Sequence, residues 1–359
     1  MTRLYRFLWL AVLLVAGGCA SGRRERSSAS PSASTVFYPA APEQPRLQLL
    51  AHYARAEDLV AIGAFERFVV GEAVGAGRGE LVKPYGVGWH RGRLYVCDAA
   101  AAHVIVYDFE RKEVRPIDPE RSGAFAKPID IAIAPDGWKY ITDTGQRRVH
   151  VYDADDRYRQ SFGTPEAWKP TGIAASTDRL FVTDVQAHCV FVLDRRTGRE
   201  IARLGKEGGG QGEFHFPVSA ALGPDGDLYV TDSFNSRVQR LRPDGTWVRS
   251  FGSLGKGPGQ FSRPRGVSVD QEGRVYVVDA AFENVQIFDE KGQLLLFFGG
   301  PGAKPGDMNL PASIRVSTEA IPYFKDRVAP GHSIEGVVFV TSQFGVNKVN
   351  VYGILAKVK

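Results

Sequence analysis

Histidines are the residues of this chain whose side chains are best suited to hold a metal ion. Of the seven histidines, His103, His188 and His215 fall on loops that a repeated unit, described below, places at one rim of the molecule. Zinc sites usually contain ligands at short spacings along the chain. No such spacing connects these three residues, and each unit contributes at most one. The sequence therefore predicts solvated loop histidines and no metal site, and these three residues are the candidates if a site exists.

Other motifs of covalent or cofactor chemistry are absent from the sequence. It contains no Cys-x-x-Cys-His haem site, no P-loop and no nucleophile elbow. We therefore expect no catalytic residue and no cofactor. Cys97 and Cys189 lie in units that are not neighbours, so we expect no disulfide between them. Cys97 stands where other units have threonine, which indicates a small packing residue.

An aspartate ends the second strand of five repeated units. A carboxylate at this place, entering a loop, can accept hydrogen bonds from backbone N–H groups and can pair with an arginine five residues on. Its recurrence in nearly every unit predicts a structural role rather than a catalytic one. The five residues are Asp98, Asp143, Asp184, Asp232 and Asp279.

The loops of the same rim carry aromatic side chains together with arginine and asparagine. Aromatic and arginine residues contribute strongly to protein interfaces, so these loops are candidates for partner binding. The alternative is that the aromatic rings fill space between units. The candidate residues are Arg148, Phe234, Arg237, Phe282, Asn284 and Phe344.

The elements that must position these residues are short β-strands. Residues 216–252 contain four strand-forming runs, and Pro-Asp-Gly turns begin at Pro224 and Pro243. Such runs bounded by turn residues predict antiparallel strands. Residues 263–299 repeat the pattern. Apolar side chains point to both faces of the second run, and a single four-stranded sheet cannot cover both its faces, so copies must stack.

The unit occurs six times. Each copy opens with a proline, and the spacings between these prolines are 44, 42, 47, 47 and 47 residues. Periods of 40 to 50 residues with four strands each are typical of propeller blades. The fold class predicted is all-β, a six-bladed β-propeller. The prolines are Pro84, Pro128, Pro170, Pro217, Pro264 and Pro311.

These landmarks resemble the NHL repeat family of six-bladed β-propellers. The best match is residues 229–241, YVTDSFNSRVQRL, and Gln146 and Arg148 keep part of the pattern. Units one, three and five depart from it at the asparagine and arginine positions. The resemblance covers residues 83–355 and implies the fold more strongly than a function, because the family includes binding scaffolds, sensor domains and a few lyases. Related metal-dependent lyases hold a central metal with histidines from several blades.

The last unit lacks a fourth strand, and the N-terminal side of the domain holds a spare one. We expect residues 46–53, RLQLLAHY, to complete the sixth blade, because an unpaired edge there would invite aggregation. A competing candidate is residues 65–71. Two insertions interrupt the repeat: residues 57–81, expected to be partly helical and able to cap the channel or dock a partner, and residues 317–336, expected to be a loop on the opposite rim.

The N-terminus resembles a bacterial lipoprotein leader. Residues 1–18 have two arginines and a short apolar run, and Ala16-Gly17-Gly18-Cys19 resembles the lipobox, which implies lipidation of Cys19 after cleavage. Residues 19–45 are rich in Ser, Ala and Pro and predict a flexible tether, within which Phe37 and Tyr38 could dock on the domain. The propeller, residues 46–359, would then be anchored in the cell envelope. Ala20 mildly favours the outer membrane, with the domain facing the periplasm or the surface.

The charge of the chain excludes one class of partner. The formal net charge of +5 arises mostly before Leu47, so no concentrated basic face is expected and no nucleic acid partner. The sequence predicts a non-enzymatic scaffold that binds a protein, peptide or cell-envelope glycan. The alternatives are a metal-dependent lyase or hydrolase with its site in the central channel, and a structural subunit of an envelope complex.

Overall fold

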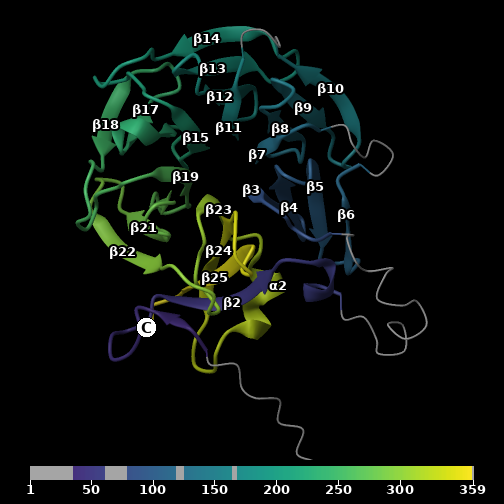
Figure 1. Cartoon of the computed structure of the whole chain (residues 1–359), viewed down its shortest axis with the longest axis vertical. Coiled ribbons are helices and arrows are strands. Elements are labelled where there is room, and N and C mark those ends of the chain that lie inside the picture. Colours follow the sequence, from purple (N-terminus) through teal and green to yellow (C-terminus); the bar gives the residue numbers. More distant parts are fainter. Residues whose placement is uncertain (1–34, 61–78, 119–124, 164–167, 358–359) are drawn as a thin grey trace, which may run out of the picture. The chain divides into compact units, whose positions relative to one another are not determined.

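The computed structural model describes residues 35–60, 79–118, 125–163 and 168–357. The repeated units form six antiparallel sheets, the blades, arranged in a ring (Figure 1). The predicted all-β, six-bladed propeller is therefore confirmed. Each blade opens at the proline identified from the sequence, whose fixed φ suits the first residue of a strand.

The strands alternate in direction within every blade. Blade 1 contains β3 (Pro84–His90), β4 (Arg93–Asp98), β5 (His103–Asp108) and β6 (Glu113–Pro116). Blade 2 contains β7 (Pro128–Ile133), β8 (Lys139–Asp143), β9 (Arg148–Tyr152) and β10 (Tyr158–Phe162). Blade 3 contains β11 (Pro170–Ala175), β12 (Arg179–Asp184), β13 (Cys189–Asp194) and β14 (Glu200–Leu204). Blade 4 contains β15 (Pro217–Leu222), β16 (Leu228–Asp232), β17 (Arg237–Leu241) and β18 (Trp247–Phe251). Blade 5 contains β19 (Pro264–Val269), β20 (Val275–Asp279), β21 (Asn284–Phe288) and β22 (Leu294–Gly299). Blade 6 contains β23 (Pro311–Ser317), β24 (Ile334–Ser342) and β25 (Val349–Leu355), completed by β2 (Leu47–Tyr53) and β1 (Phe37–Tyr38).

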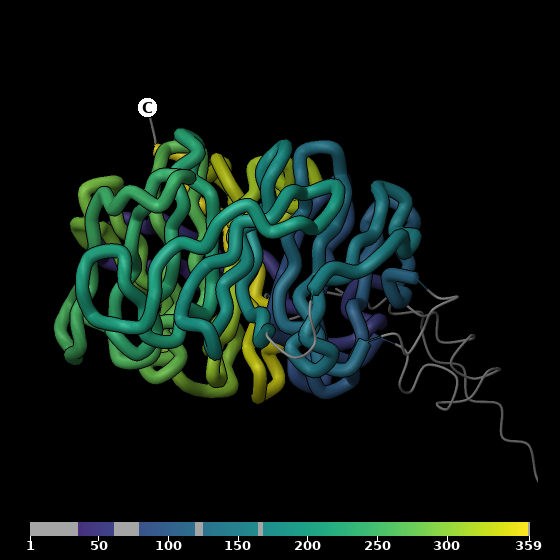
Figure 2. Tube along the Cα trace, turned by 90° about the horizontal axis from the view of Figure 1, so that it is seen from above, coloured from purple at the N-terminus to yellow at the C-terminus, as the bar shows by residue number. Residues whose placement is uncertain are grey.

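The hydrophobic core lies between the blades. The second strands are covered on both faces, as in β16, where every residue is buried. The first strand of each blade is the innermost, and these six strands neighbour one another around the axis. Figure 2 shows the teal and green blades from the side, with strands running between two rims. Residues at the ends of the first strands therefore converge on one central channel.

Glycines in alternate blades let the innermost strands approach closely. A Cβ atom added to Gly86 would lie 2.6 Å from the Cα atom of Asp130, and one added to Gly172 would lie 2.4 Å from the Cα atom of Ser219. Only glycine avoids these backbone clashes. Because β3 and β7 approach this closely at Gly86, the position of Asp130 on β7 is fixed relative to blade 1.

The ring is closed by the N-terminal strand predicted from the sequence. β2 pairs antiparallel with β25, from Leu47 opposite Ile354 to Tyr53 opposite Val349. Figure 1 shows this purple strand beside the yellow C-terminal blade. The competing strand, residues 65–71, lies outside the described residues. So does most of the 57–81 insertion, of which Ala56–Asp58 form a short 3-10 helix at the start.

The end of the segment expected to be a tether lies on the propeller. Phe37 and Tyr38 form β1, which pairs with β2. The Tyr38 ring packs 5.8 Å from Phe298 and 5.9 Å from Tyr352, measured between ring centroids. The described domain thus begins before residue 46. Residues 1–34, which include Cys19, lie outside the described part of the chain.

The 317–336 insertion connects β23 to β24 within blade 6 and packs against blade 1. It contains α2 (Ile321–Phe324) and η4 (Lys325–Arg327). Phe324 is fully buried against Trp89 of β3 and Phe339 of β24. The side-chain amide of Gln48 on β2 donates a hydrogen bond to the backbone carbonyl oxygen of Arg327 in the insertion at 3.0 Å. None of the helices in the described residues is long and apolar enough to span a bilayer.

Candidate functional site: the mouth of the central channel

Two sets of loops meet at one rim of the propeller, here called the loop rim. They are the loops between second and third strands and the connections that lead into each first strand. The backbone N–H of Thr144 donates to Lys127 O at 3.1 Å, and that of Ala280 donates to Arg263 O at 3.0 Å. The same bond recurs from Ser233 to Phe216 O. The residue that precedes each blade proline is therefore held at the loop rim.

The repeated aspartates support these loops. Asp143 is completely buried, and its carboxylate accepts hydrogen bonds from the backbone N–H groups of Ala126 (2.7 Å), Lys127 (3.0 Å) and Gln146 (2.8 Å). Burial raises the pKa of Asp232, whose carboxylate also accepts bonds from Asn235 and Arg237. These carboxylates are enclosed and engaged by backbone donors, as expected of structural groups. Corresponding backbone contacts are made by Asp98, Asp184 and Asp279.

A cavity of about 370 Å³ opens at the centre of the loop rim. Its wall is made by the innermost strands and by the residues that precede them. Four cationic side chains line it, and Asp130 is the only acidic residue among the described residues of its lining. We call these four residues the channel-mouth cations; they are Lys127, Lys169, Arg263 and Arg265.

The channel-mouth cations outnumber the single described acidic residue of the lining, Asp130. None of them makes an ion pair with a described carboxylate. Three of them directly precede a blade proline, a position that blade 1 also fills with Lys83. The sequence analysis missed this set, although a basic residue before the proline in four of six units is a visible signal.

Two arginines and one aspartate of this region lie on the innermost strands themselves: Arg265 on β19, Arg315 on β23 and Asp130 on β7. Burial lowers the pKa of Arg265, and the nearby Tyr85 hydroxyl offsets part of that effect. Burial also lowers the pKa of Arg315 on β23, against the attraction of Asp130. The pKa of Asp130 is raised to about 7 by burial, although backbone N–H groups of Ile131 (2.9 Å) and Ile173 (3.1 Å) donate to it.

Arg315 departs from the pattern of its repeat. The fifth residue counted from the blade proline is small in every other blade, and here it is arginine. Arg315 makes no ion pair with a described carboxylate. The sequence analysis did not identify it, and the comparison among blades would have shown it. The corresponding residues are Gly88, Ala132, Ala174, Ala221 and Ser268.

Of the predicted aromatic residues, Phe234 and Phe344 are exposed. Phe234 is 60% exposed and stacks on Phe216 with a centroid distance of 4.3 Å, and both rings line the channel mouth. Phe344 is 51% exposed, and the Lys83 ammonium lies 5.1 Å from the centre of its ring. Phe282 is half-buried. The channel mouth thus combines uncompensated cations with an accessible aromatic pair.

The polar residues expected at the loop rim have different environments. Arg237 is held inside the molecule: it pairs with Asp232 at 2.9 Å and donates to the carbonyl oxygens of Gly209, Gly210 and Glu213. Such saturation indicates a structural residue. Arg148 and Asn284 begin the third strands of blades 2 and 5, Arg148 exposed and Asn284 half-buried.

Two of the three candidate histidines come together. His188, Glu207 and His215 offer ligand atoms within 4.8 Å of one another, and His103 in blade 1 is outside this group. The sequence analysis missed Glu207. Nδ1 of His188 accepts a hydrogen bond from the backbone N–H of Phe216 at 3.3 Å. The Nδ1 lone pair of His188 is therefore engaged, and a metal ion could bind Nδ1 only by displacing this hydrogen bond.

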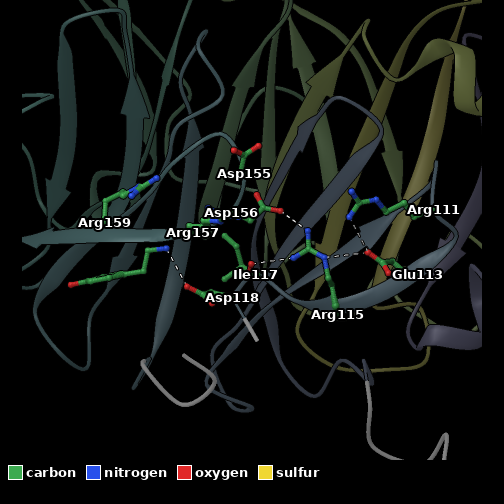
Figure 3. Close-up of a pocket in the computed structure, with 10 residues that line it drawn as sticks. Arg111, Glu113, Arg115, Ile117, Asp118, Asp155, Asp156, Arg157 and Arg159 are labelled. Carbon is green, nitrogen blue, oxygen red and sulfur yellow. Dashed lines mark hydrogen bonds and ion pairs between the residues drawn. The ribbon is translucent and has the colours of Figure 1, made fainter. Parts of the chain in front are cut away.

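A second pocket lies between blades 1 and 2 and is also rich in arginine (Figure 3). Its lining holds four arginines and four acidic residues, and three of the arginines contact carboxylates: Arg111 pairs with Glu113 at 3.7 Å, and Arg115 pairs with Asp156 at 2.7 Å. Arg159 pairs with Asp153. Balanced charges of this kind leave little attraction for an added ion, in contrast to the channel mouth.

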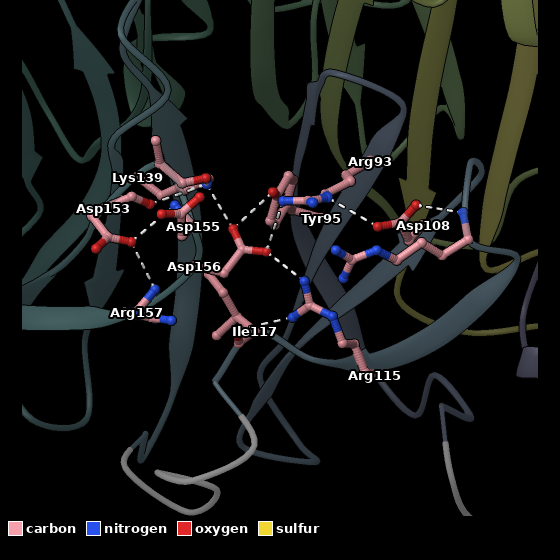
Figure 4. A network of polar contacts seen from close by, with 12 residues as sticks. Arg93, Tyr95, Asp108, Arg115, Ile117, Lys139, Asp153, Asp155, Asp156 and Arg157 are labelled. Atoms are coloured by element: carbon pink, nitrogen blue, oxygen red, sulfur yellow. Dashed lines mark hydrogen bonds and ion pairs between the residues drawn. The ribbon is translucent and has the colours of Figure 1, made fainter.

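The wall of that pocket is a buried polar network that joins the two blades (Figure 4). The Asp156 carboxylate accepts bonds from Lys139 Nζ at 2.6 Å and the Tyr95 hydroxyl at 2.9 Å. Lys139 is fully buried, and burial lowers its pKa, while burial and Asp156 raise the pKa of Tyr95. Because Lys139 and Tyr95 both contact the Asp156 carboxylate, the network fixes the packing of blade 1 on blade 2.

Comparison with known proteins agrees with this architecture. The NHL repeat family model matches residues 214–241 and 261–288. A gluconolactonase from Xanthomonas campestris superposes with a TM-score of 0.56 at 16% identity, over 87% of this chain and 89% of that one. A protein of unknown function from Bacteroides thetaiotaomicron gives 0.59 at 18% identity, over 77% and 70%. A streptogramin B lyase gives 0.53 at 14% identity, over 77% and 84%. At these identities the likeness concerns the fold alone, and the chain is a six-bladed β-propeller with matches to the NHL repeat model in blades 4 and 5.

Proposed function

We propose that this chain is a membrane-anchored scaffold of the cell envelope that binds an acidic protein or peptide over the mouth of its channel. The observation that carries the proposal is the group of four channel-mouth cations around one cavity, which face a single described acidic residue, Asp130, and form no ion pair with a described carboxylate. A partner that presents carboxylates there gains attraction that the free protein does not supply internally.

The exposed aromatic pair makes the same surface suitable for a protein. Phe234 offers a large rigid apolar face at low conformational cost, and the stacked Phe216 holds it in place. Uncompensated cations beside an aromatic anchor favour an acidic peptide segment over a neutral glycan. The solved structures with this fold include a lyase and a lactonase, so the fold does not choose among functions, and the residues of the site must.

The lipobox motif supports the location in this proposal. Lipidation of Cys19 would hold the domain at a membrane outside the cytoplasm. Residues 20–34 would connect the anchor to β1, the first described strand. Such a tether lets the loop rim reach partners in the envelope while the propeller stays close to the bilayer.

Affinity purification from detergent-solubilised membranes tests the binding function. The bait is the full chain, compared with Phe234→Ala at the channel mouth and with Phe297→Ala on β22, whose ring is 57% exposed. We expect Phe234→Ala to lose the partner and Phe297→Ala to retain it. The captured partner should be acidic and should be released by salt, because screening weakens exposed charge pairs.

A partner that binds both variants equally, or that resists salt, would contradict the proposal. A glycan captured through Phe234 would replace the acidic protein. The melting temperature of Phe234→Ala serves as the folding control, since loss of an exposed aromatic pair costs only about 0.5–1.5 kcal/mol.

A further inference from the structure

We propose that the channel behind its mouth is a binding site for a multivalent oxyanion, a group that carries several carboxylates or phosphates. Arg265 and Arg315 would bind it from the innermost strands β19 and β23, and Lys127, Lys169 and Arg263 from the residues that precede the blade prolines. The inference deepens the proposed function and rests on it only for the identity of the complete ligand.

The first argument is the imbalance of charge in the cavity. Four cations and one aspartate line about 370 Å³. In the arginine-rich pocket between blades 1 and 2, four arginines share the lining with four acidic residues, and Arg111, Arg115 and Arg159 each pair with a carboxylate. The same chain thus neutralises one arginine-rich pocket and leaves the other positive. A cavity with low-dielectric walls and charges of one sign concentrates ions of the opposite sign.

The second argument is the position of Arg315. The channel wall has Gly, Ala or Ser at this place in the other five blades, and here a long cation enters instead. A guanidinium removed from bulk water without an ion pair is unfavourable unless another group compensates it. Its planar donors match carboxylate and phosphate oxygens, which can accept two hydrogen bonds side by side.

The third argument concerns the number of charges on the ligand. Asp130 is the only described acid that faces this group, and it attracts Arg315 without forming an ion pair. One negative charge cannot balance the four lining cations together with Arg315. A ligand with at least two negative groups fits the excess, and the cavity lies within the usual range for small-molecule sites, roughly 300–1,000 Å³.

Isothermal titration calorimetry on the full chain in detergent tests the inference. The probes are citrate and inorganic pyrophosphate, each compared with sodium chloride at equal ionic strength. We expect at least one probe to bind and to raise the melting temperature, because a ligand of the folded state stabilises it. Citrate alone would identify carboxylates, pyrophosphate alone would identify phosphates, and binding of both would assign the shared charge.

The variants are Arg265→Gln and Arg315→Gln, with Lys291→Gln as the matched control on the turn between β21 and β22, at the opposite rim. Loss of one charge-assisted contact should weaken binding about 10- to 100-fold for each arginine and leave the control unchanged. Without a probe, Arg315→Gln should melt at the same temperature as the wild type or higher, because it removes an uncompensated charge.

Three results would overturn the inference: neither probe binds the wild type; the control loses as much affinity as the arginine variants; or Arg315→Gln melts lower without a probe and still binds normally. If the probes fail while Phe234→Ala still loses its partner, the oxyanion site is wrong and the scaffold function stands. If the probes bind and no acidic partner is found, the reverse holds.

Discussion

Individual side chains in this protein show how position rather than number decides an electrostatic site. Beyond residue 46 the chain is nearly neutral, and no concentrated basic face was expected. Lys127, Lys169 and Arg263 nevertheless share one cavity, because each precedes the innermost strand of a different blade. The expectation of no concentrated basic face was thus incomplete at the channel mouth.

Arg237 illustrates the opposite outcome. As a loop arginine it was a candidate for partner binding, yet its guanidinium donates to Asp232 and to three carbonyl oxygens of the preceding connection. Arg237 lies in a segment that matches the NHL repeat model. In this structure its side chain holds two loops together. A single sequence cannot separate these roles, because both place an arginine on a loop.

Asp130 gives a prediction at this scale. Its pKa is raised to about 7, so the folded chain holds this proton more tightly than the unfolded chain does. Its contribution to stability therefore falls as the pH rises from about 4 to about 7 and is constant above that. Asp130→Asn keeps an oxygen acceptor and cannot ionise. We expect its melting temperature, minus that of the wild type, to increase from pH 5 to pH 8.

The neighbours of Asp130 do not disturb this measurement. Arg315 attracts Asp130 and keeps its charge at these pH values, and the pKa of the buried Cys97 thiol, the other group coupled to Asp130, is raised by burial well above its usual range. A melting-temperature difference that stays flat across this interval would show that Asp130 is ionised like an exposed aspartate.

At the scale of elements, the fold depends on a strand borrowed from the other end of the chain. β2 covers β25, which would otherwise expose unpaired backbone groups along seven residues. Leu47 is 1% exposed and packs with Val338 and Ile354. The N-terminal strand therefore contributes both backbone pairing and core volume.

A pair of leucine substitutions tests this contribution. Leu47→Ala on β2 should lower the free energy of unfolding by about 2–5 kcal/mol, since it removes a buried side chain and leaves a cavity. Leu295→Ala on β22 is the matched control, because Leu295 is 55% exposed and should cost at most about 0.5 kcal/mol. Chemical denaturation measures both. Equal losses would mean that β2 is not part of the folded blade in solution.

The 317–336 insertion adds a second link between the first and last blades. The backbone N–H of Arg91 donates to Glu319 at 2.8 Å, and the Tyr323 hydroxyl donates to Glu110 at 2.7 Å. Both bonds reach from the insertion to blade 1. Sequence inspection noted its aromatic residues, yet the partners could not be predicted, because they lie more than 200 residues away.

At the scale of the whole molecule, we propose that the closed ring is held at a membrane by its lipidated N-terminus. β2, which follows the leader in the chain, completes blade 6, and we propose that a lipid at Cys19 would hold the closed propeller outside the cytoplasm. This arrangement requires only that the leader is processed as its motif implies.

The anchor is tested by Cys19→Ser. We expect the variant to lose incorporation of radioactive palmitate and to leave the membrane fraction, because no acyl chain can be attached. The wild type and Cys189→Ser, which alters a buried cysteine of the propeller, should both remain labelled. Labelling that persists in Cys19→Ser would remove the lipid anchor from the proposal.

Turn residues, apolar alternation and a proline at each unit are local signals, so the sequence alone was enough for the six blades, their four strands and the strand that closes the ring. The blades and their strands follow from steric and hydrophobic rules that act within about ten residues, whereas the closing strand was inferred from the fourth strand that the last unit lacks. The grouping of Lys127, Lys169, Arg263 and Arg265 around one cavity, with Arg315 on the innermost strand β23, follows instead from the convergence of innermost strands on one axis. Residues separated by a whole repeat meet there only after the ring has closed, and for that reason the folded chain was needed to reveal the channel site.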